Sequence, residues 1–265
     1  MQFALNHMVA SSLGYEPFFD LAVSLGINAV EIRNDIATSQ MDMGAAKVIK
    51  GHAASRGLKI ISVNALQRFN QWNDTRAREA DELAAYAHAA GAEALVLCPV
   101  NDTAFTPSTS ERLGGLRDAL KNLAPILNRH QVKGLVEPLG FAECSLRLKA
   151  EAIAAIDATD TAESFALVHD TFHHFVAAEA QMFPDRTGLV HISGVTDKAQ
   201  TAATMLDPHR VLVDARDMID NAGQIRALLA EGYGGYFSFE PFAAEVHADR
   251  DVAGSLKASR DHLAA

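Results

Sequence analysis

Residues 165–193, FALVHDTFHHFVAAEAQMFPDRTGLVHIS, contain the pattern that decides the fold. A short apolar run at Phe165–Asp170 ends on polar residues, a helical pattern follows at Phe172–Met182, and a second apolar run covers Gly188–Ser193. Short, nearly continuous apolar strands are typical of a parallel sheet that is covered on both faces. The stretch therefore predicts a strand, a helix and a second strand parallel to the first.

The same alternation recurs through the whole chain. Further strands are predicted at Phe3–His7, Ala29–Arg33, Lys59–Asn64, Ala94–Pro99, Gly134–Pro138 and Gly235–Pro241. Helical patterns between them cover Tyr15–Leu25, Asp42–Arg56, Asp74–Ala90, Ser110–His130, Lys149–Ala158, Asp220–Glu231 and Asp249–Leu263. A glycine such as Gly26 or Gly91 follows several of these patterns and is a typical helix terminator. Asp74 is the expected N-cap of its helix.

Roughly eight strand-helix units without a long linker predict an α/β fold, a single (β/α)8 TIM barrel domain over residues 1–265. The length of 265 residues agrees with the roughly 250 residues that such a barrel requires. A doubly wound sheet is the alternative fold. It would usually show a glycine-rich phosphate loop after a strand, and neither G-x-G-x-x-G nor a Walker-type loop is present.

Composition limits the classes of partner. The chain has 23 basic and 33 acidic residues, and this balance disfavours binding to nucleic acid. Two cysteines, Cys98 and Cys144, are too few for a disulfide scaffold and predict reduced thiols in the cytoplasm. We see neither an apolar run approaching the roughly 18 residues of a membrane span nor a signal peptide. The expected partner is a small molecule, and a homo-oligomer remains open.

Four ionisable residues of metal-binding type stand at the ends of the last four predicted strands. They are Glu137, Asp170, His191 and Glu240, and each follows apolar neighbours. All strands of a parallel barrel open on one face, so these side chains are expected to converge there. Three carboxylates and one imidazole suit one divalent cation such as Mn²⁺, Mg²⁺, Co²⁺ or Zn²⁺. The alternative is that each residue pairs separately with a lysine or an arginine.

Two further residues are expected to bind substrate at this mouth. His173 follows Asp170 by three positions, which places both on one side of a helical turn. Arg210 ends the sequence Asp207-Pro208-His209-Arg210 in the loop after the seventh strand, where it could hold a hydroxyl, carbonyl or phosphate. The alternatives are a packing or solvated histidine and a plain surface turn.

The loop after the third strand supplies two more substrate-binding candidates. Asn64 ends the strand, and the only tryptophan, Trp72, follows within the same loop. An aromatic wall of this kind suits the apolar face of a sugar or cyclitol ring, but such a loop can equally pack on itself. Cys98 precedes Pro99 at a strand end and is interpreted as structural. We find neither G-x-S-x-G nor H-E-x-x-H.

These residues resemble the xylose-isomerase-like barrel superfamily, which includes sugar isomerases, epimerases and apurinic endonucleases. The nearest branch is that of bacterial 2-keto-myo-inositol (inosose) isomerases. The similar segments are Val30–Arg33, Asn64–Leu66, Phe69–Asn70, Glu143–Ser145, His169–His173, Val190–Ile192, Asp207–Val211 and Phe239–Phe242. The resemblance implies that Glu137, Asp170, His191 and Glu240 bind the metal. It also implies that the two glutamates exchange protons with a substrate held by His173 and Arg210.

Two departures from the family pattern put the substrate, more than the metal site, in question. Ser193 and Gly194 stand where relatives usually carry an aspartate after the histidine of the seventh strand. Val211–Arg216 replaces a Gly-x-Gly turn that relatives commonly carry after the arginine. A loop without those glycines must follow a different backbone path or have bulkier walls.

The leading functional hypothesis is metal-dependent isomerisation of a keto-polyol through an enediolate, with Glu137 and Glu240 as proton acceptor and donor. Alternatives within this chemistry are a ketose 3-epimerase and a hydroxypyruvate isomerase. An apurinic endonuclease is a weaker alternative, because the strand ends at Asn64 and Cys98 lack the extra histidines of a three-zinc site. A sugar-binding barrel without turnover is the last alternative.

Overall fold

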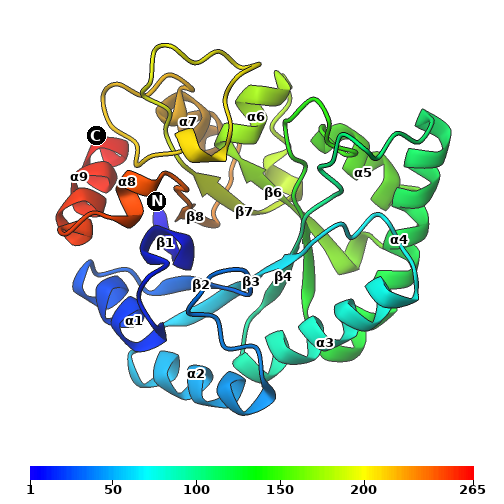
Figure 1. The fold of residues 1–265 in the computed structure, drawn as a ribbon, viewed down its shortest axis with the longest axis horizontal. Helices are drawn as coiled ribbons and strands as arrows, with labels where there is room; N and C mark the ends of the chain where they lie inside the picture. Colours follow the sequence, from blue (N-terminus) through cyan, green and yellow to red (C-terminus); the bar gives the residue numbers. More distant parts are fainter.

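The computed structural model describes residues 1–265 as a closed barrel of eight parallel strands, in the order β1 to β8 (Figure 1). This confirms the predicted (β/α)8 architecture. The strands are β1 (Gln2–Asn6), β2 (Ala29–Arg33), β3 (Lys59–Leu66), β4 (Ala94–Leu97), β5 (Lys133–Val136), β6 (Phe165–Asp170), β7 (Thr187–Ile192) and β8 (Tyr236–Phe239).

Helices surround the barrel and follow the strands in turn (Figure 1). They are α1 (Tyr15–Ser24), α2 (Met43–Ser55), α3 (Asp74–Ala90), α4 (Thr109–His130), α5 (Lys149–Asp157), α6 (Thr171–Ala177), α7 (Asn221–Ala230), α8 (Ala244–His247) and α9 (Val252–Ala264). None of them is both long enough and apolar enough to cross a membrane.

Element boundaries differ from the sequence predictions where capping decides them. Asn73, not Asp74, caps α3, because its side chain accepts a hydrogen bond from the backbone N–H of Arg76. The predicted Phe172–Met182 helix ends early, since Ala178 adopts a left-handed conformation after α6. Asp251 caps the last helix, so α9 begins at Val252 instead of Asp249. Gly91, with φ of +75°, ends α3 as expected.

Two apolar layers hold the barrel together. The larger lies between strands and helices and contains 52 buried residues. The smaller fills the barrel interior with 10 buried residues, several of them alanines. The interior changes character toward the carboxyl ends of the strands, where buried side chains become polar or charged.

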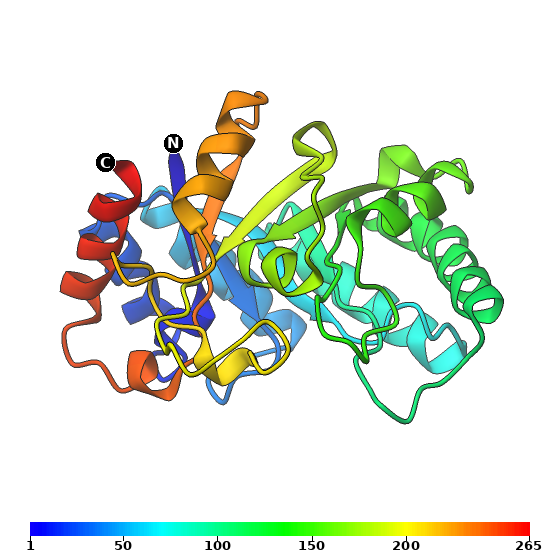
Figure 2. The ribbon, with the colours of Figure 1, turned by 90° about the horizontal axis from the view of Figure 1, so that it is seen from above.

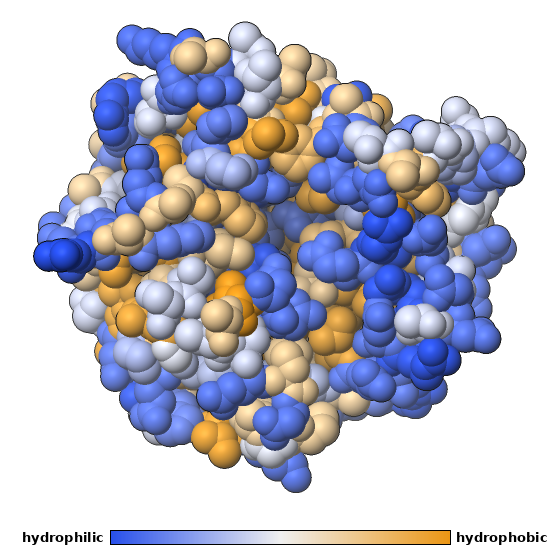
Figure 3. All heavy atoms as spheres, viewed as in Figure 1, coloured by the Kyte–Doolittle hydropathy of each residue, from blue (hydrophilic) through white to orange (hydrophobic).

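The loops that follow the strands gather on one face, opposite the N-terminus (Figure 2). Figure 1 looks onto this loop-bearing face, and Figure 3 shows it hollowed near its middle, with hydrophilic side chains on the floor. This is the face where enzymes of this architecture place their active sites.

Candidate metal centre

Glu137, Asp170, His191 and Glu240 converge at the mouth of the barrel. Strand pairing explains the convergence, because Asp170 on β6 is in register with His191 on β7. The two glutamates lie just beyond β5 and β8, where their backbone N–H groups bond to Leu97 and Ile192. All four side chains are buried, and their ligand atoms lie within 4.8 Å of one another.

His191 stands at the centre of the group. Its Nδ1 atom lies 2.8 Å from Oε1 of Glu137, 3.1 Å from Oε2 of Glu240 and 3.9 Å from Oδ2 of Asp170. Burial alone would lower the pKa of His191, but the charges of Glu240, Glu31 and Glu137 raise it well above its ordinary value. One nitrogen and three carboxylate oxygens thus face a common point, as the sequence predicts.

Two arginines contact the same carboxylates. Arg210 donates from Nη2 to Asp170 at 2.6 Å and to Glu240 at 3.0 Å, and Arg33 donates from Nη1 to Glu240 at 2.7 Å. Burial alone would raise the pKa of Glu240, but His191, Arg210 and Arg33 lower it well below its ordinary value. The four residues therefore converge on one point, and two of their carboxylates are also paired with arginine.

The charges of this region fit a divalent cation. Four buried carboxylates, Glu137, Asp170 and Glu240 together with Glu31, face only the two buried guanidinium groups of Arg33 and Arg210. Two negative charges therefore remain when His191 is neutral, and uncompensated buried charge is costly. Three carboxylate oxygens and an imidazole nitrogen are a suitable donor set for such an ion.

Glu31 and Arg33 are buried parts of this site that sequence reasoning left without a role. Glu31 is fully buried on β2, and its Oε2 lies 3.1 Å from Nε2 of His191. Arg33 extends from the end of the same strand and binds Asp35 through two hydrogen bonds of 2.7 Å. The sequence does carry a signal for them, because two opposite charges within an otherwise apolar strand indicate buried polar residues with a specific role.

His173 lies at the first turn of α6. The side chain of Asp170 caps this helix by accepting a 2.9 Å hydrogen bond from the His173 backbone N–H. The His173 ring is buried in edge-to-face contact with Phe141 and Phe172. Its Nδ1 atom is buried and has no hydrogen-bond partner within the protein, so substrate contact by His173 stays a prediction.

Asn64 and Trp72 occupy different places. The Asn64 amide is buried and donates to Oε2 of Glu31 at 2.8 Å, so it contacts the site from within the barrel. Trp72 is partly buried and packs against the main apolar core. Asn70 of the same loop bonds to Ser145 and to the backbone of Val100. The loop thus packs partly on the protein, and substrate contact by Asn64 and Trp72 stays a prediction.

Cys98 lies closer to the site than its structural interpretation implies. Its Sγ atom is 3.5 Å from Oε2 of Glu137. Burial and the neighbouring glutamates raise the pKa of the Cys98 thiol well above its ordinary value. The thiol therefore acts as a weak hydrogen-bond donor to Glu137.

Local contacts fix the two ends of the loop after β7. The Ser193 hydroxyl accepts a 2.9 Å hydrogen bond from Nε of Arg210. Gly194 and Val211 exchange two backbone hydrogen bonds of 2.8 Å. These bonds join the two ends of the loop beside the barrel mouth. A Cβ atom on Gly194 would approach the Val213 backbone to 3.2 Å, so the glycine permits this close contact.

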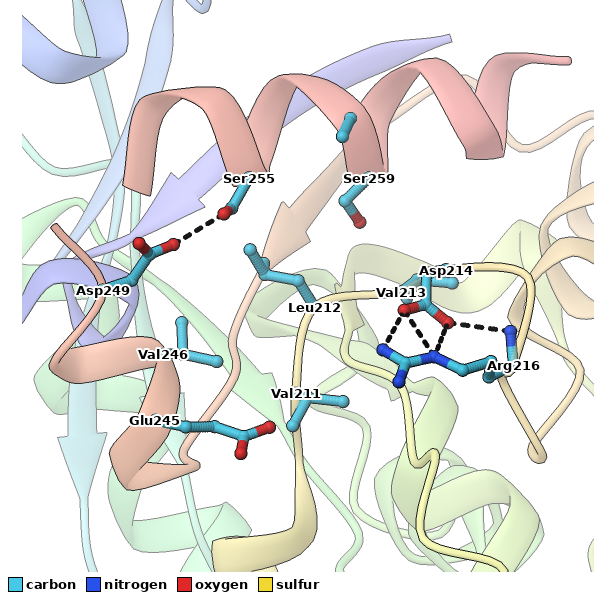
Figure 4. A pocket seen from close by; sticks show the side chains of 11 residues that line it. Val211, Leu212, Val213, Asp214, Arg216, Glu245, Val246, Asp249, Ser255 and Ser259 are labelled. Atoms are coloured by element: carbon cyan, nitrogen blue, oxygen red, sulfur yellow. Dashed lines mark hydrogen bonds and ion pairs between the residues drawn. The ribbon is translucent and has the colours of Figure 1, made fainter. Parts of the chain in front are cut away.

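A cavity of about 410 Å³ lies beside the same loop, lined by Val211–Asp214 and by residues of α8 and α9 (Figure 4). It shares no lining residue with the four-residue cluster. Two of its polar pairs are internal, Asp214 with Arg216 and Asp249 with Ser255 (Figure 4). The buried Ser259 hydroxyl has no partner. The cavity is therefore distinct from the candidate metal centre.

Comparisons with known proteins agree with this geometry. A family model described as xylose isomerase-like TIM barrel matches residues 19–264. A xylose isomerase domain containing protein from Salmonella typhimurium LT2 is 31% identical, with a TM-score of 0.88 over 99% of this chain and 96% of its own. No curated protein matches significantly.

Two more distant solved structures share the fold. An IOLI protein with a bound zinc atom has a TM-score of 0.88 at 19% identity, over 99% of this chain and 98% of its own. D-psicose 3-epimerase with D-tagatose, from Clostridium cellulolyticum H10, has a TM-score of 0.78 at 15% identity, over 98% and 97%.

Proposed function

Because this chain belongs to the xylose isomerase-like TIM barrel family, we propose that it is a divalent-metal-dependent isomerase of a neutral keto-polyol, such as an inosose. The observation that carries the proposal is the convergence of Glu137, Asp170, His191 and Glu240 within 4.8 Å of one another. The presence of all four ligands argues against a sugar-binding barrel without turnover.

The four clustered side chains would hold the metal ion. A bound divalent cation polarises a substrate carbonyl and stabilises the negative charge that develops on oxygen in an enediolate. The zinc atom in the IOLI structure supports this assignment. The donor set also accepts Mn²⁺, Mg²⁺ or Co²⁺.

Glu137 and Glu240 would carry the proton between adjacent carbons. Both carboxylates face the mouth, and proton transfer between neighbouring carbons needs a base on one side and an acid on the other. Oε2 of Glu137 has only the Cys98 thiol beside it, whereas both oxygens of Glu240 accept hydrogen bonds from arginine. We assign the first proton abstraction to Glu137 on these contacts.

The arginines near the mouth are already paired with protein carboxylates, and this favours a neutral substrate. Arg210 donates to Ser193, Asp207, Asp170 and Glu240, and Arg33 is equally committed. Neither guanidinium is free to take a substrate carboxylate or phosphate, which argues against hydroxypyruvate. Arg210 would then act on substrate mainly through the carboxylates that it orients. His173, which follows the cluster residue Asp170 and bonds to it through its backbone N–H, is then the remaining candidate for direct contact with substrate.

A ketose 3-epimerase is the second candidate. D-psicose 3-epimerase and L-ribulose 3-epimerase share this fold, and epimerisation needs the same pair of proton-transferring groups. An apurinic endonuclease is disfavoured, because the cluster forms one site and the chain carries a net charge of −10.

Proton exchange in deuterated water tests the proposal. The protein with added Mn²⁺ or Zn²⁺ is incubated separately with an inosose, a free ketohexose and hydroxypyruvate, and ¹H NMR follows the α-proton. We expect exchange with the neutral ketones and none with hydroxypyruvate. Glu137→Gln is the matched control and should abolish exchange. Exchange confined to ketohexoses would select the epimerase, and exchange confined to hydroxypyruvate would contradict the proposed substrate class.

A further inference from the structure

We propose that Glu31 is a positioning residue that holds the proton of His191 on Nε2 and thereby presents Nδ1 to the metal ion. The inference rests on the proposed function, because it concerns the same metal site. It adds a residue on β2, the opposite side of the barrel from β5 and β6, to the machinery of the centre.

The two ring nitrogens of His191 face different surroundings. Nδ1 faces the three carboxylates that share the cluster, the nearest at 2.8 Å. Nε2 faces away from them toward Oε2 of Glu31, at 3.1 Å. An imidazole that binds a metal through Nδ1 keeps its hydrogen on Nε2, and that N–H needs an acceptor. His191 is fully buried, and Glu31 is its only partner on that side.

The Glu31 carboxylate is itself fixed by four neutral donors. Oε1 accepts hydrogen bonds from Asn6 and Ser238, and Oε2 accepts from Ser62 and Asn64. These donors come from β1, β8 and β3, and strand register brings Glu31 opposite both Asn6 and Ser62. Such a cradle leaves the carboxylate little freedom to rotate, so the direction of its bond to His191 is determined by the barrel itself.

The partners of Glu31 indicate why a carboxylate occupies this position. No lysine or arginine contacts Glu31, although it is fully buried and its charge would otherwise be costly. The hydrogen bond to Nε2 of His191 connects the Glu31 carboxylate directly to a ligand of the candidate metal centre. A carboxylate bonded to the distal nitrogen raises the basicity of the ligating nitrogen and fixes the orientation of the ring.

Zinc binding by wild type and Glu31→Gln tests the proposal directly. Gln preserves the shape of the side chain and removes its charge. We expect Zn²⁺ affinity, measured by competition with a chromophoric chelator, to fall about 10- to 100-fold. Ser62→Ala is the matched control, since it removes a donor to the same Glu31 oxygen but leaves the contact with His191. Its affinity should change by less than the tenfold lower limit for Glu31→Gln.

Long-range ¹H–¹⁵N NMR of the zinc-loaded wild-type protein gives a second readout that requires no variant. We expect His191 to retain its hydrogen on Nε2 and to bind zinc through Nδ1. Coordination through Nε2, or a folded Glu31→Gln with wild-type affinity, would overturn the inference while leaving the metal site intact. A wild-type protein that binds no zinc, manganese, cobalt or magnesium would instead overturn the proposed function, and this inference with it.

Discussion

Glu137 and Glu240 both lie beside Nδ1 of His191, but they have very different partners. Glu240 accepts hydrogen bonds from Arg33 and Asn6 on one oxygen and from Arg210 on the other. Glu137 has His191 on one oxygen and only the Cys98 thiol, at 3.5 Å, on the other. The sequence presents them alike, each following an apolar strand and preceding a proline.

The difference separates two tasks that one carboxylate could not perform equally well. Charged hydrogen bonds on both oxygens fix Glu240 as an anion and restrict its movement. Phe242 packs against the guanidinium groups of both Arg33 and Arg210, at 5.4 and 4.5 Å from its ring centre, which further restrains this side. Glu137 retains an oxygen that can take and release a proton. We therefore interpret the β8 side as an anchor and the β5 side as the reactive side.

The largest expected effect is on turnover. Glu137→Gln removes the base, so kcat at saturating metal should fall about 10²- to 10⁴-fold. Glu240→Gln should also reduce kcat severely, because the second proton transfer needs this carboxylate. Steady-state kinetics, together with solvent-deuterium exchange, separates the two steps. If Glu137→Gln retained near-wild-type exchange, the assignment of the first abstraction to Glu137 would be wrong.

The next largest effect is on the free energy of unfolding, which should fall more in Glu240→Gln than in Glu137→Gln. Glu240→Gln leaves two buried guanidinium groups with less negative charge, and breaking a buried ion pair costs about 3–5 kcal/mol. Asp35, Asp170 and Asp207 still pair with these arginines, so the low end of that range is expected. Glu137→Gln removes one of several mutually repelling carboxylates and should cost less. Urea unfolding of the metal-free proteins compares them, and equal losses would refute the anchor interpretation.

The fold and the convergence of the four candidate metal ligands could be predicted from the sequence because both depend on local order. Each strand is a short apolar run, and a parallel barrel automatically brings all strand ends to one face, so Asp170 and His191 could be placed together. The partners of these residues were not accessible. Glu31 and Arg33 bond to residues up to 207 positions away, and such pairs follow from barrel closure rather than from local pattern.

The positions of the side chains of Asn64, Trp72 and Cys98 likewise could not be predicted from local sequence pattern. Sequence reasoning placed Asn64 and Trp72 together at the mouth, but a strand end and a loop side chain can point to different places. Asn64 lies within the barrel on Glu31, and Trp72 packs on the outer core. Cys98 was interpreted as structural because no local feature indicates a lowered thiol pKa. The structure raises that pKa, in agreement, but also places the thiol beside Glu137, which the sequence does not reveal.

A pH effect of intermediate size is expected from His7, next to the strand β1 that pairs with β8. His7 follows β1 and stacks on Phe18 with 4.2 Å between ring centres, and burial lowers its pKa to about 4. Between about pH 6.5 and pH 4, His7 is therefore protonated in the unfolded chain but neutral in the folded chain. The free energy of unfolding falls as the pH drops through this window. The loss due to His7 between pH 7 and pH 5 should be about 2 kcal/mol.

His7→Gln isolates this contribution, since glutamine keeps an N–H donor for the Leu13 carbonyl that His7 contacts at 2.9 Å. Urea unfolding at pH 7 and pH 5 should show a smaller pH-dependent loss in the variant than in wild type. Burial also lowers the pKa of His174 to about 4, so part of the acid sensitivity persists in both proteins. Identical losses in the two proteins would show that His7 is not the group responsible.

The smallest expected effect tests the reactive side through Cys98. Cys98→Ser replaces a weak S–H donor by a stronger O–H donor to Oε2 of Glu137. If the freedom of that oxygen matters, the added hydrogen bond should slow proton abstraction by about 0.5–1.5 kcal/mol, or roughly 2- to 13-fold in kcat. Cys98→Ala removes the donor and should leave kcat at or above that of Cys98→Ser. Steady-state kinetics decides the order, and a slower alanine variant would mean that Glu137 needs the donor instead of being hindered by it.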